Sequence, residues 1–372
     1  MDAHYLASAA FWEDDGCFVA GEFGGVLPEL GTCVLFRTSG STGAGKWIVL
    51  EKKAMLHSAQ AVNEWLEVGG KSVWGLALPL NHVGGFSIAA RVYLAGCGLK
   101  VIEGKWEAES FAKWHQEAGI THLSLVPTQV HDLVKAGLRG AESLEAVVVG
   151  GGNLPAEMGQ AARDLGWPVL ASYGMTETCS QVATQKVNGL EMGFAAQPLE
   201  VLPIWDAFVG ECGLLKLSGD ALFSGCLVER DSNWFFAERE GRQFTTNDRV
   251  GLRGGILKPL GRADSLVKVL GELVDLEEIE RAFINCSGGG VDRDCFAVVN
   301  LPNSRRENEL VAVFEQISGK EQEHFTAYQG QASGIARLES WVSIEKFPRS
   351  PLGKLRRGRL REMVGELFSG GA

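Results

Sequence analysis

The ten residues from Arg37 to Lys46 combine the residue types of a phosphate-binding loop. Two hydroxyl–glycine pairs and a lysine follow an apolar, β-prone segment at residues 32–36. Glycines allow positive φ and let backbone N–H groups approach an anion, while hydroxyls add donors and the lysine adds positive charge. The sequence therefore predicts a phosphate site here. Its predicted ligands are Thr38, Ser39, Gly40, Ser41, Thr42, Gly43 and Lys46.

Two alternatives to this interpretation exist. The run from Gly40 to Lys46 fits the first part of the G-x-x-x-x-G-K pattern, but Trp47 stands where that pattern needs Ser or Thr to hold magnesium. A lysine of that pattern also opens a helix, whereas Trp47-Ile48-Val49-Leu50 predicts a strand. The simpler alternative is a glycine-rich hairpin that binds nothing.

Other chemistry-bearing residues follow predicted strands. Tyr173-Gly174-Met175-Thr176-Glu177 follows the strand predicted at 168–173, and Gly150-Gly151-Gly152 closes the one at 144–149. Glu177 offers the carboxylate oxygen that a hard cation prefers. Each motif alone is equally compatible with an ordinary turn or a helix-entry loop. Ligands of such folds bind beyond the carboxyl ends of the strands, which is where both motifs fall.

The chain resembles the adenylate-forming superfamily of acyl-CoA synthetases, luciferases and adenylation domains. The resemblance rests on five motifs in the family's order, and it covers nearly all of the chain after residue 30. One departure is Gly45, since a proline usually precedes the lysine of the first motif. The five motifs are Thr-Ser-Gly-Ser-Thr-Gly-x-x-Lys from Thr38, Tyr-Gly-x-Thr-Glu from Tyr173, Thr-Asn-Asp from Thr246, Gly-Arg-x-Asp-x-x-x-Lys-x-x-Gly from Gly261, and Pro-x-Ser-x-x-Gly-Lys-x-x-Arg from Pro348.

The resemblance implies roles for the residues of the large domain. Thr176 would contact the phosphates, Glu177 would hold Mg²⁺, and Tyr173, within Tyr173-Gly174-Met175, would flank the adenine. The backbone of Gly150, Gly151 and Gly152 would pack against the adenine ring. Asp248 would accept hydrogen bonds from both ribose hydroxyls. The alternative is that Asp248 is a turn residue before Arg249 without a role in binding.

Towards the C-terminus the resemblance implies a mobile domain. Arg262 would contact the ribose or a phosphate, and Asp264 would be the hinge. The hairpin turning near Gly271, with Lys268 on its first arm, would line the pantetheine channel. Lys354 would be the adenylation lysine, bridging the substrate carboxylate and the α-phosphate. The alternative for Lys354 is a solvated basic tail.

The acid is suggested by two shorter segments. Residues 79–85 and 124–129 resemble the corresponding parts of o-succinylbenzoate–CoA ligases of menaquinone biosynthesis. His82, Thr128 and Gln129 are the predicted substrate contacts. His82 is also compatible with a satisfied core histidine, and Thr128 and Gln129 with a helix cap.

The implied reaction joins a small carboxylic acid to CoA, with ATP and Mg²⁺ as the other components. The acid attacks the α-phosphate to give an acyl-adenylate and pyrophosphate, and the CoA thiolate then displaces AMP. Catalysis rests on charge and positioning by Lys46, Thr176, Glu177 and Lys354. For Cys179, which lies beside the Thr-Glu pair, we expect a packing role rather than covalent catalysis. The alternatives are another aryl- or acyl-CoA ligase, a stand-alone adenylation enzyme, and a non-catalytic nucleotide binder.

Composition and charge exclude several classes of protein. Net charge is −11 over 372 residues, which argues against nucleic-acid partners. Eight scattered cysteines form no C-x-x-C pair, and the sequence has neither an apolar run long enough to span a membrane nor a signal-peptide pattern. We therefore expect reduced thiols, a cytoplasmic location and no membrane span.

Alternating strand and helix patterns between residues 46 and 173 predict an α/β fold with a mostly parallel sheet covered on both faces. Short strands from about 207 to 260 predict a small β-rich subdomain. We place a large ATP- and acyl-binding domain at residues 1–262 and a smaller α+β domain at 263–372. The first motif normally lies more than about a hundred residues into a relative, so we expect a shortened N-terminal subdomain. A homo-oligomer is possible.

Overall fold

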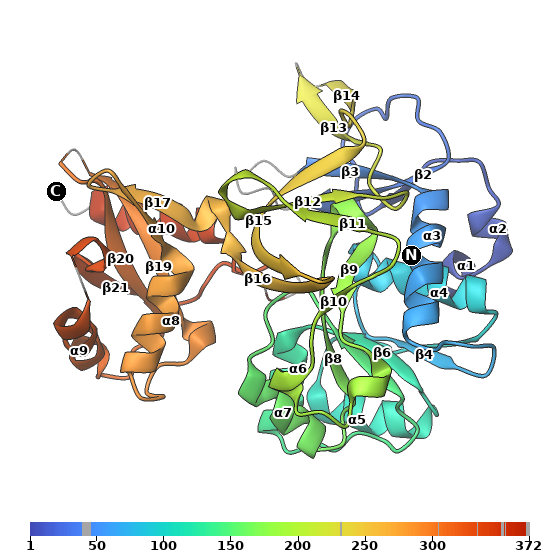
Figure 1. Cartoon of the computed structure of the whole chain (residues 1–372), viewed down its shortest axis with the longest axis horizontal. Coiled ribbons are helices and arrows are strands. Elements are labelled where there is room, and N and C mark those ends of the chain that lie inside the picture. The colour runs from blue at the N-terminus through green and yellow to red at the C-terminus, as the bar shows by residue number, and fades with distance from the viewer. Residues whose placement is uncertain are drawn as a thin grey trace. The chain divides into compact units, whose positions relative to one another are not determined.

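The computed structural model describes residues 1–38, 46–230, 233–303, 305–332, 334–350, 353 and 355–369, without the side chains of Asp264 and Ser369. The described residues form two compact units (Figure 1). Unit one contains residues 1–38, 46–246 and 250–259. Unit two contains residues 247–249 and the chain from residue 260 onward.

Parallel strands form the centre of unit one, in the order β5-β4-β6-β7-β8. Because parallel neighbours point the same way, the loops that follow them gather at one edge of the sheet. The strands are β4 (Val73–Leu76), β5 (Gly98–Val101), β6 (His122–Leu125), β7 (Ala146–Val149) and β8 (Val169–Met175).

The same sheet continues beyond β8 in the order β9-β10-β16-β15-β12-β11, and its pairs β8–β9, β9–β10, β10–β16 and β11–β12 are antiparallel. These strands are β9 (Ser180–Thr184), β10 (Glu200–Val201), β11 (Asp206–Val209), β12 (Leu214–Ser218), β15 (Gln243–Arg253) and β16 (Ile256–Arg262).

Helices cover both faces of the parallel strands. Side chains alternate along β7, so that Ala146 and Val148 face one hydrophobic core while Val147 and Val149 face another. The first core includes α3 (Lys52–Trp65) and α4 (Val83–Ala95), which lie side by side (Figure 1). The second core includes α5 (Ala108–Glu117), α6 (Pro127–Lys135) and α7 (Ala156–Asp164).

A second sheet in unit one has the order β1-β2-β3-β13-β14. Its strands β2 and β3 are antiparallel and flank the predicted phosphate loop, whereas β1 pairs with β2 in parallel. The strands are β1 (Phe18–Ala20), β2 (Cys33–Thr38), β3 (Lys46–Glu51), β13 (Gly225–Arg230) and β14 (Asn233–Glu238), and the short helices α1 (Ala3–Leu6) and α2 (Ala9–Trp12) precede them.

Unit two combines a hairpin, a three-stranded sheet and helices. In the three-stranded sheet, β20 lies between an antiparallel and a parallel neighbour. Helix α8 packs Leu276, Ile279 and Phe283 into the core of this unit. The elements are β17 (Leu266–Val269), β18 (Glu272–Asp275), α8 (Leu276–Cys286), β19 (Phe296–Asn303), β20 (Glu307–Glu315), α9 (Glu321–Gln331), β21 (Ser340–Ile344) and α10 (Arg357–Ser369).

Short 3₁₀ helices connect several elements. They are η1 (Thr176–Thr178), η2 (Val187–Gly189), η3 (Phe194–Ala196), η4 (Glu211–Gly213), η5 (Ala263–Ser265), η6 (Arg293–Cys295) and η7 (Gly334–Ala336).

The predicted α/β class with a parallel, helix-covered sheet is confirmed, but the bounds of some elements differ from the expected ones. Strand β8 continues through Met175, so only Thr176 and Glu177 of that motif follow the strand. Helix α6 begins at Pro127, because proline is favoured in a first helical turn. Strand β15 is eleven residues long. The strands from β11 to β16 extend the two sheets of unit one.

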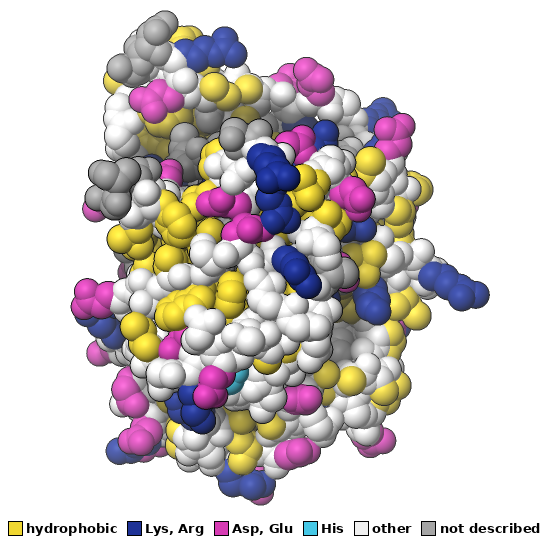
Figure 2. All heavy atoms as spheres, turned by 90° about the vertical axis from the view of Figure 1, so that its left-hand side faces the viewer, with side chains coloured by type: hydrophobic (Ala, Val, Ile, Leu, Met, Phe, Trp, Pro, Cys, Tyr) yellow, Lys and Arg dark blue, Asp and Glu magenta, His cyan; other side chains and the backbone are white. Residues whose placement is uncertain are grey.

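The surface is mixed in character. On the face drawn in Figure 2, basic and acidic side chains are interspersed with apolar patches. Within the described ranges, no helix combines the length and apolar character needed to cross a bilayer.

Candidate active site

The loops after β6, β7 and β8 meet at the carboxyl edge of the parallel sheet. The N–H of Gly150 donates to the carbonyl of Leu125 at 3.1 Å. A Cβ placed on Gly150 would lie 3.9 Å from the carbonyl oxygen of Ser172, and one on Gly152 would lie 3.3 Å from Cγ of Pro127. The glycine run therefore lies beside the start of α6 and the end of β8, as predicted from strand order.

This glycine run exposes backbone without side chains. Gly151 has φ +78°, a conformation that L side chains rarely adopt. A Cβ added to Gly150 would have its nearest neighbour at 3.9 Å, an ordinary contact distance. The run can therefore present a flat backbone surface, which is what stacking against a planar ring requires.

The Tyr173–Glu177 motif is held tightly. A Cβ on Gly174 would lie 1.6 Å from the carbonyl oxygen of Ser180, so only glycine fits at this β-bulge. Buried Thr178 accepts from the N–H of Met175 at 3.2 Å and donates to its carbonyl at 3.0 Å. The carbonyl of Glu177 accepts from the N–H of Phe223 at 2.9 Å.

Thr178 and Phe223 were missed by the sequence analysis, although they fix the turn that carries Thr176 and Glu177. The sequence feature that could have revealed Thr178 is its hydroxyl group directly after the Thr-Glu motif. Phe223 gave no local signal, because its contact is made across the fold. The backbone after the turn is unusual: Cys179 has φ +53° and Ser180 has φ +117°. Such conformations in non-glycine residues concentrate at functional sites.

The predicted phosphate loop connects two paired strands. Thr38 is opposite Lys46 in the β2–β3 register, and the Thr38 hydroxyl donates to the Lys46 carbonyl at 3.2 Å. The exposed Lys46 opens a strand and not a helix, which excludes the P-loop interpretation. Residues 39–45, with Ser39, Gly40, Ser41, Thr42 and Gly43, lie outside the described residues.

Two predicted nucleotide ligands are brought together in unit two. Nη1 of Arg262 donates to Oδ1 of Asp248 at 3.1 Å. These residues lie on the neighbouring strands β15 and β16. The Asp248 side chain is largely buried, whereas about half of the Arg262 side chain (48%) is exposed.

The hairpin predicted near Gly271 is confirmed. Strands β17 and β18 pair from Leu266–Asp275 to Val269–Glu272, and positive φ at Leu270 (+54°) and Gly271 (+83°) makes the turn between them. The exposed Lys268 lies on the first arm. Leu273, opposite Lys268, is 62% exposed. The hairpin thus presents a cation and apolar groups on its surface. Asp264 lies in η5, and its side chain is outside the described part.

The end of unit two carries the segment predicted to hold the adenylation lysine. Lys354 itself lies outside the described residues. Arg357, the last residue of that motif, donates from Nη2 to Oε2 of Glu280 at 3.0 Å and from Nη1 to the carbonyl of Val298 at 2.6 Å. Burial lowers the pKa of Arg357, but the hydrogen bond and charge of Glu280 outweigh burial and raise it. Arg357 is therefore an anchor of α10 rather than part of a solvated basic tail.

The predicted substrate residues differ in their surroundings. Oε1 of Gln129 accepts from the N–H of Val126 at 3.0 Å, and its Nε2 donates to the carbonyl of Ala77 at 3.2 Å. The buried Gln129 therefore caps α6 and ties it to the end of β4, which favours the helix-cap interpretation. Half-buried Thr128 lies in the first turn of the same helix.

His82 is the N-cap residue of α4, and its backbone carbonyl accepts from the N–H of Phe86 at 3.0 Å. Nε2 of its imidazole is buried and has no hydrogen-bond partner among the described residues. Burial lowers the pKa of His82. A satisfied core histidine would have a partner, so this geometry leaves the substrate interpretation of His82 open.

Arg91 on α4 is a buried cation that the sequence analysis missed. Its side chain is almost fully enclosed (1% exposed), and burial lowers the pKa of its guanidinium to about 9. Within the described ranges, no carboxylate lies within ion-pair distance of this guanidinium. Its neutral partners are Ser87 at 3.2 Å, Ser124 at 3.4 Å and Ser180 at 3.4 Å, with the Trp74 ring centroid 5.2 Å away.

A buried guanidinium without a counter-ion is costly to maintain. Ser124 lies near the end of β6, and Ser180 follows the Thr-Glu motif, so Arg91 lies behind the carboxyl edge of the sheet. The position suits an anionic group of a ligand. No sequence motif signalled it, because one arginine in an apolar helix has no pattern around it.

Cys179 is excluded as a nucleophile by its surroundings. Its side chain is buried (1% exposed), and burial raises the pKa of its thiol. A thiol held protonated in an apolar core is unreactive. This agrees with the predicted packing role.

The residues present fit a magnesium ion that arrives with nucleotide. No cluster of three or more potential metal-binding side chains (His, Cys, Asp or Glu) occurs in the described part of the chain. Mg²⁺ in ATP sites is typically held by one or two carboxylates together with phosphates and water. The single carboxylate of Glu177, on a turn fixed by Thr178 and Phe223, matches that donor set.

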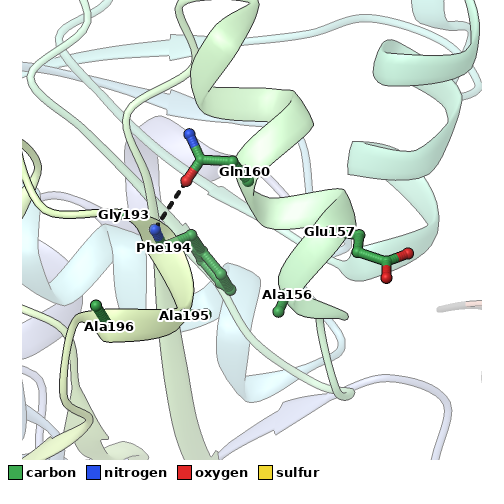
Figure 3. Close-up of a pocket in the computed structure, with 7 residues that line it drawn as sticks. All are labelled: Ala156, Glu157, Gln160, Gly193, Phe194, Ala195 and Ala196. Atoms are coloured by element: carbon green, nitrogen blue, oxygen red, sulfur yellow. Dashed lines mark hydrogen bonds between the residues drawn. The ribbon is translucent and has the colours of Figure 1, made fainter.

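A shallow hollow of about 340 Å³ lies between α7 and η3 (Figure 3). Among its lining residues, the N–H of Phe194 donates to Oε1 of Gln160 at 2.9 Å. The lining is mainly apolar with one carboxylate, Glu157. Its seven lining residues include no predicted site residue, so the hollow is separate from the nucleotide motifs.

The chain belongs to the AMP-binding enzyme family, whose model matches residues 28–213. Among curated relatives, the 2-succinylbenzoate–CoA ligase of Escherichia coli (strain K12) is 34% identical over 251 residues, which are 67% of this chain and 52% of that protein. The 2-succinylbenzoate–CoA ligase of Enterococcus faecalis is 30% identical over 353 residues, which are 89% of this chain and 69% of that protein.

A solved structure shows the same fold. It is the o-succinylbenzoate CoA synthetase (MenE) from Bacillus subtilis in complex with the acyl-adenylate intermediate OSB-AMP. The TM-score is 0.74 at 22% identity, covering 88% of this chain and 68% of that one. This chain thus spans about half of the E. coli relative and about two thirds of the other two.

Proposed function

We propose that this protein activates a carboxylic acid with ATP and transfers the acyl group to coenzyme A, and that the acid is o-succinylbenzoate. In the first half-reaction the carboxylate displaces pyrophosphate to form an acyl-adenylate. In the second, the CoA thiolate displaces AMP. Support comes from family membership and from curated relatives named 2-succinylbenzoate–CoA ligases. A place in menaquinone biosynthesis and a cytoplasmic location, where ATP and CoA are available, belong to the same proposal.

The observation that carries the acid's identity is the buried cation Arg91. o-Succinylbenzoate has two carboxylates, of which only one is converted to the adenylate. The other remains anionic and needs a counter-charge in an enclosed site. Arg91, surrounded by the hydroxyls of Ser87, Ser124 and Ser180, offers that charge at the edge where the nucleotide motifs gather. A monocarboxylic acid would leave the guanidinium unpaired.

The nucleotide half of the site is assigned to the motif residues. Lys46, Thr38 and the loop between them bind phosphate, Thr176 contacts the phosphates, and Glu177 holds the magnesium ion, which neutralises phosphate charge when bound. Gly150, Gly151, Gly152 and Tyr173 enclose the adenine, Asp248 binds the ribose, and Arg262 binds the ribose or a phosphate. Lys354 bridges the acid and the α-phosphate.

The second half-reaction is assigned to unit two. Residues 1–262 form the large domain and residues 263–372 a domain that rotates about Asp264. The hairpin with Lys268 and Gly271 then lines the path of the pantetheine. Proline fixes φ and removes an N–H, so Asp264→Pro should leave pyrophosphate release intact while thioester formation from pre-made acyl-adenylate collapses.

The test is pyrophosphate release and thioester formation over a panel of acids. Wild-type protein should use o-succinylbenzoate in preference to benzoate and to a fatty acid. Arg91→Met should raise the KM for o-succinylbenzoate by about 100-fold or more, because a buried charge partner is lost. Arg163→Met is the matched control, since Arg163 bonds the backbone carbonyls of Val169 and Met192.

The thermal unfolding of the ligand-free protein separates the roles of Arg91. If Arg91 stabilised the fold, removing it would lower the unfolding temperature. Removing an uncompensated buried charge would not lower it. Arg91→Met should therefore unfold at the wild-type temperature or above. If the protein formed thioesters with benzoate but not with o-succinylbenzoate, the proposed substrate would be wrong. The proposed acid–CoA ligase activity would still hold. A protein that adenylates no acid of the panel would instead be a nucleotide binder.

A further inference from the structure

Two cysteines of unit one lie in sulfur–sulfur contact. Sγ of Cys33 is 3.2 Å from Sγ of Cys17, and the Cys33 thiol is placed to donate a hydrogen bond to Cys17. Both are free thiols in this structure. Neither belongs to the motifs assigned to ATP, the acid or CoA.

Strand pairing produces this contact. β1 and β2 are parallel with Phe18 opposite Val34, so Cys17 stands opposite Cys33 one position earlier. Both cysteines contribute to the same small core, together with Val19 and Leu35 two residues further along each strand. Parallel neighbours lie about 4.8 Å apart, and disulfides join Cα atoms about 4.4–6.8 Å apart. The backbone is thus already within the range that a disulfide needs.

The backbone around both cysteines is tied in place. The hydroxyl of Thr32 donates to the carbonyl of Asp15 at 3.2 Å, and the carbonyl of Thr32 accepts from the N–H of Lys52 at 3.2 Å. The buried ammonium of Lys52 also donates to the carbonyls of Phe11 at 2.7 Å and Asp14 at 2.6 Å. The segments before Cys17 and Cys33 therefore share partners.

The two thiols are chemically unequal. Cys17 is only partly buried, whereas Cys33 is 3% exposed. The hydrogen bond from Cys33 lowers the pKa of Cys17 against the effect of burial, and the charge of Lys52 adds to the lowering. The same hydrogen bond and burial raise the pKa of Cys33. Such a pair has an accessible attacking thiolate and a protected resolving thiol.

We infer that Cys17 and Cys33 form a peroxide-sensitive dithiol, which closes to an intramolecular disulfide between β1 and β2. The Cys17 thiolate attacks one oxygen of hydrogen peroxide, giving Cys17 sulfenic acid and hydroxide, which takes up a proton to become water. The sulfur of Cys33 then attacks the sulfenic sulfur and loses its proton, and a second water leaves. Peroxide is reduced, two thiols are oxidised, and a thiol reductant reverses the change.

The test is thiol mapping of the full chain before and after hydrogen peroxide, with unreacted thiols blocked by N-ethylmaleimide under denaturing conditions. The oxidised chain should lose two of its eight maleimide-reactive cysteines and contain a linked Cys17–Cys33 peptide pair lighter by two hydrogen atoms. Dithiothreitol should restore both thiols. The oxidised chain should also unfold at a higher temperature, because the link restricts the unfolded chain.

Variants of each cysteine test which thiol attacks the peroxide and which one resolves the sulfenic acid. Cys33→Ala should stop at a sulfenic acid on Cys17 that dimedone traps, whereas Cys17→Ser should leave Cys33 reduced. Cys97→Ser, which removes a partly buried thiol elsewhere in the unit, should form the link as the wild type does. Wild-type protein that instead keeps all thiols, over-oxidises Cys17 without a link, or pairs other cysteines would overturn the inference. The mapping of the wild type decides this even if a variant fails to fold.

Discussion

Nη1 of Arg262 donates a hydrogen bond to Oδ1 of Asp248 at 3.1 Å, across the neighbouring strands β15 and β16. Asp248 and Arg262 lie fourteen residues apart in the chain, and two different motifs predicted them as nucleotide contacts. An ion pair of this exposure is worth less than about 1 kcal/mol. Its consequence is therefore orientation: the arginine holds the carboxylate in one direction on a rigid strand.

Asp248→Asn should weaken ATP binding by about tenfold or more, because an amide cannot accept two hydroxyl hydrogen bonds as a carboxylate does. The unfolding temperature should stay near the wild-type value. The measurement is the KM for ATP in pyrophosphate release, beside a thermal melt. A stability loss without a change in KM would make Asp248 a structural residue.

Gly150→Ala separates the adenine interpretation of the glycine run from a helix-entry loop. The new methyl group would meet the Ser172 carbonyl oxygen at 3.9 Å, an ordinary contact, so folding should be unaffected. If the adenine packs on this backbone, the methyl group should weaken ATP binding by about tenfold, or about 1.4 kcal/mol. Isothermal titration with ATP measures this. Unchanged affinity would support the helix-entry loop.

Gly174→Ala provides the contrasting case. Its methyl group would lie 1.6 Å from the carbonyl oxygen of Ser180, which is backbone and has no rotamer to yield. We expect a loss of about 3 kcal/mol or more in the free energy of unfolding, since overpacking against backbone forces strands apart. Urea unfolding measures it. A stable Gly174→Ala protein would show that β8 and β9 separate at little cost.

Glu177→Gln tests the metal ligand while keeping the shape of the side chain. An amide oxygen binds Mg²⁺ more weakly than a carboxylate. Activity should fall at ordinary magnesium and recover partly as magnesium is raised, with the melting temperature unchanged. Glu157→Gln, at the hollow beside α7, is the matched control and should show wild-type magnesium dependence. The same dependence in both variants would remove Glu177 from the metal site.

The sequence predicted elements whose periodicity and caps are local. The alternation at residues 46–173 predicted the parallel sheet because each strand is bounded by a helix pattern. Helix α8 has such a local cap: the Asp275 side chain accepts from the N–H of Glu277 at 3.0 Å. The Leu270–Gly271 turn was predictable because glycine tolerates the positive φ it needs.

Other features could not be predicted, because the partners are distant in the chain. Nothing near Arg91 indicates that Ser124 and Ser180, 33 and 89 residues away, would surround its guanidinium. Phe223 meets Glu177 through backbone atoms, which carry no residue signature. The extent of β15 was missed, since a pattern broken by polar residues hides a strand that is only half buried.

His115 makes the stability of unit one depend on pH. Its Nε2 accepts from the N–H of Ala141 at 3.0 Å, and the ring stacks on Phe111 in the core. Burial lowers the pKa of His115 below the ordinary 6.5, so at lower pH the unfolded chain binds a proton more readily than the folded one. This contribution to stability is complete above about pH 6.5 and is lost as pH falls towards the folded-state pKa, by up to about 1.4 kcal/mol per pH unit.

Urea unfolding between about pH 7.5 and about pH 5 measures this slope. His115→Gln should make the slope shallower, whatever its effect on absolute stability, and the remaining slope comes from groups such as His122, whose pKa burial also lowers. His57→Gln, which removes an exposed histidine, should keep the wild-type slope. Equal slopes in all three proteins would contradict the role of His115.

Lys354→Ala tests the adenylation lysine. If Lys354 bridges the acid and the α-phosphate, removing its charge should slow acyl-adenylate formation by about 100-fold or more. Thioester formation from purified acyl-adenylate should continue, since that step no longer needs the bridge. Lys346→Ala, which removes an exposed lysine of unit two, is the control and should leave both half-reactions unchanged. Arg357 ties the end of this motif to Glu280, so Arg357→Met should lower stability as well as adenylation. A Lys354→Ala protein that loses both half-reactions equally would show that the lysine holds the fold or the CoA path instead.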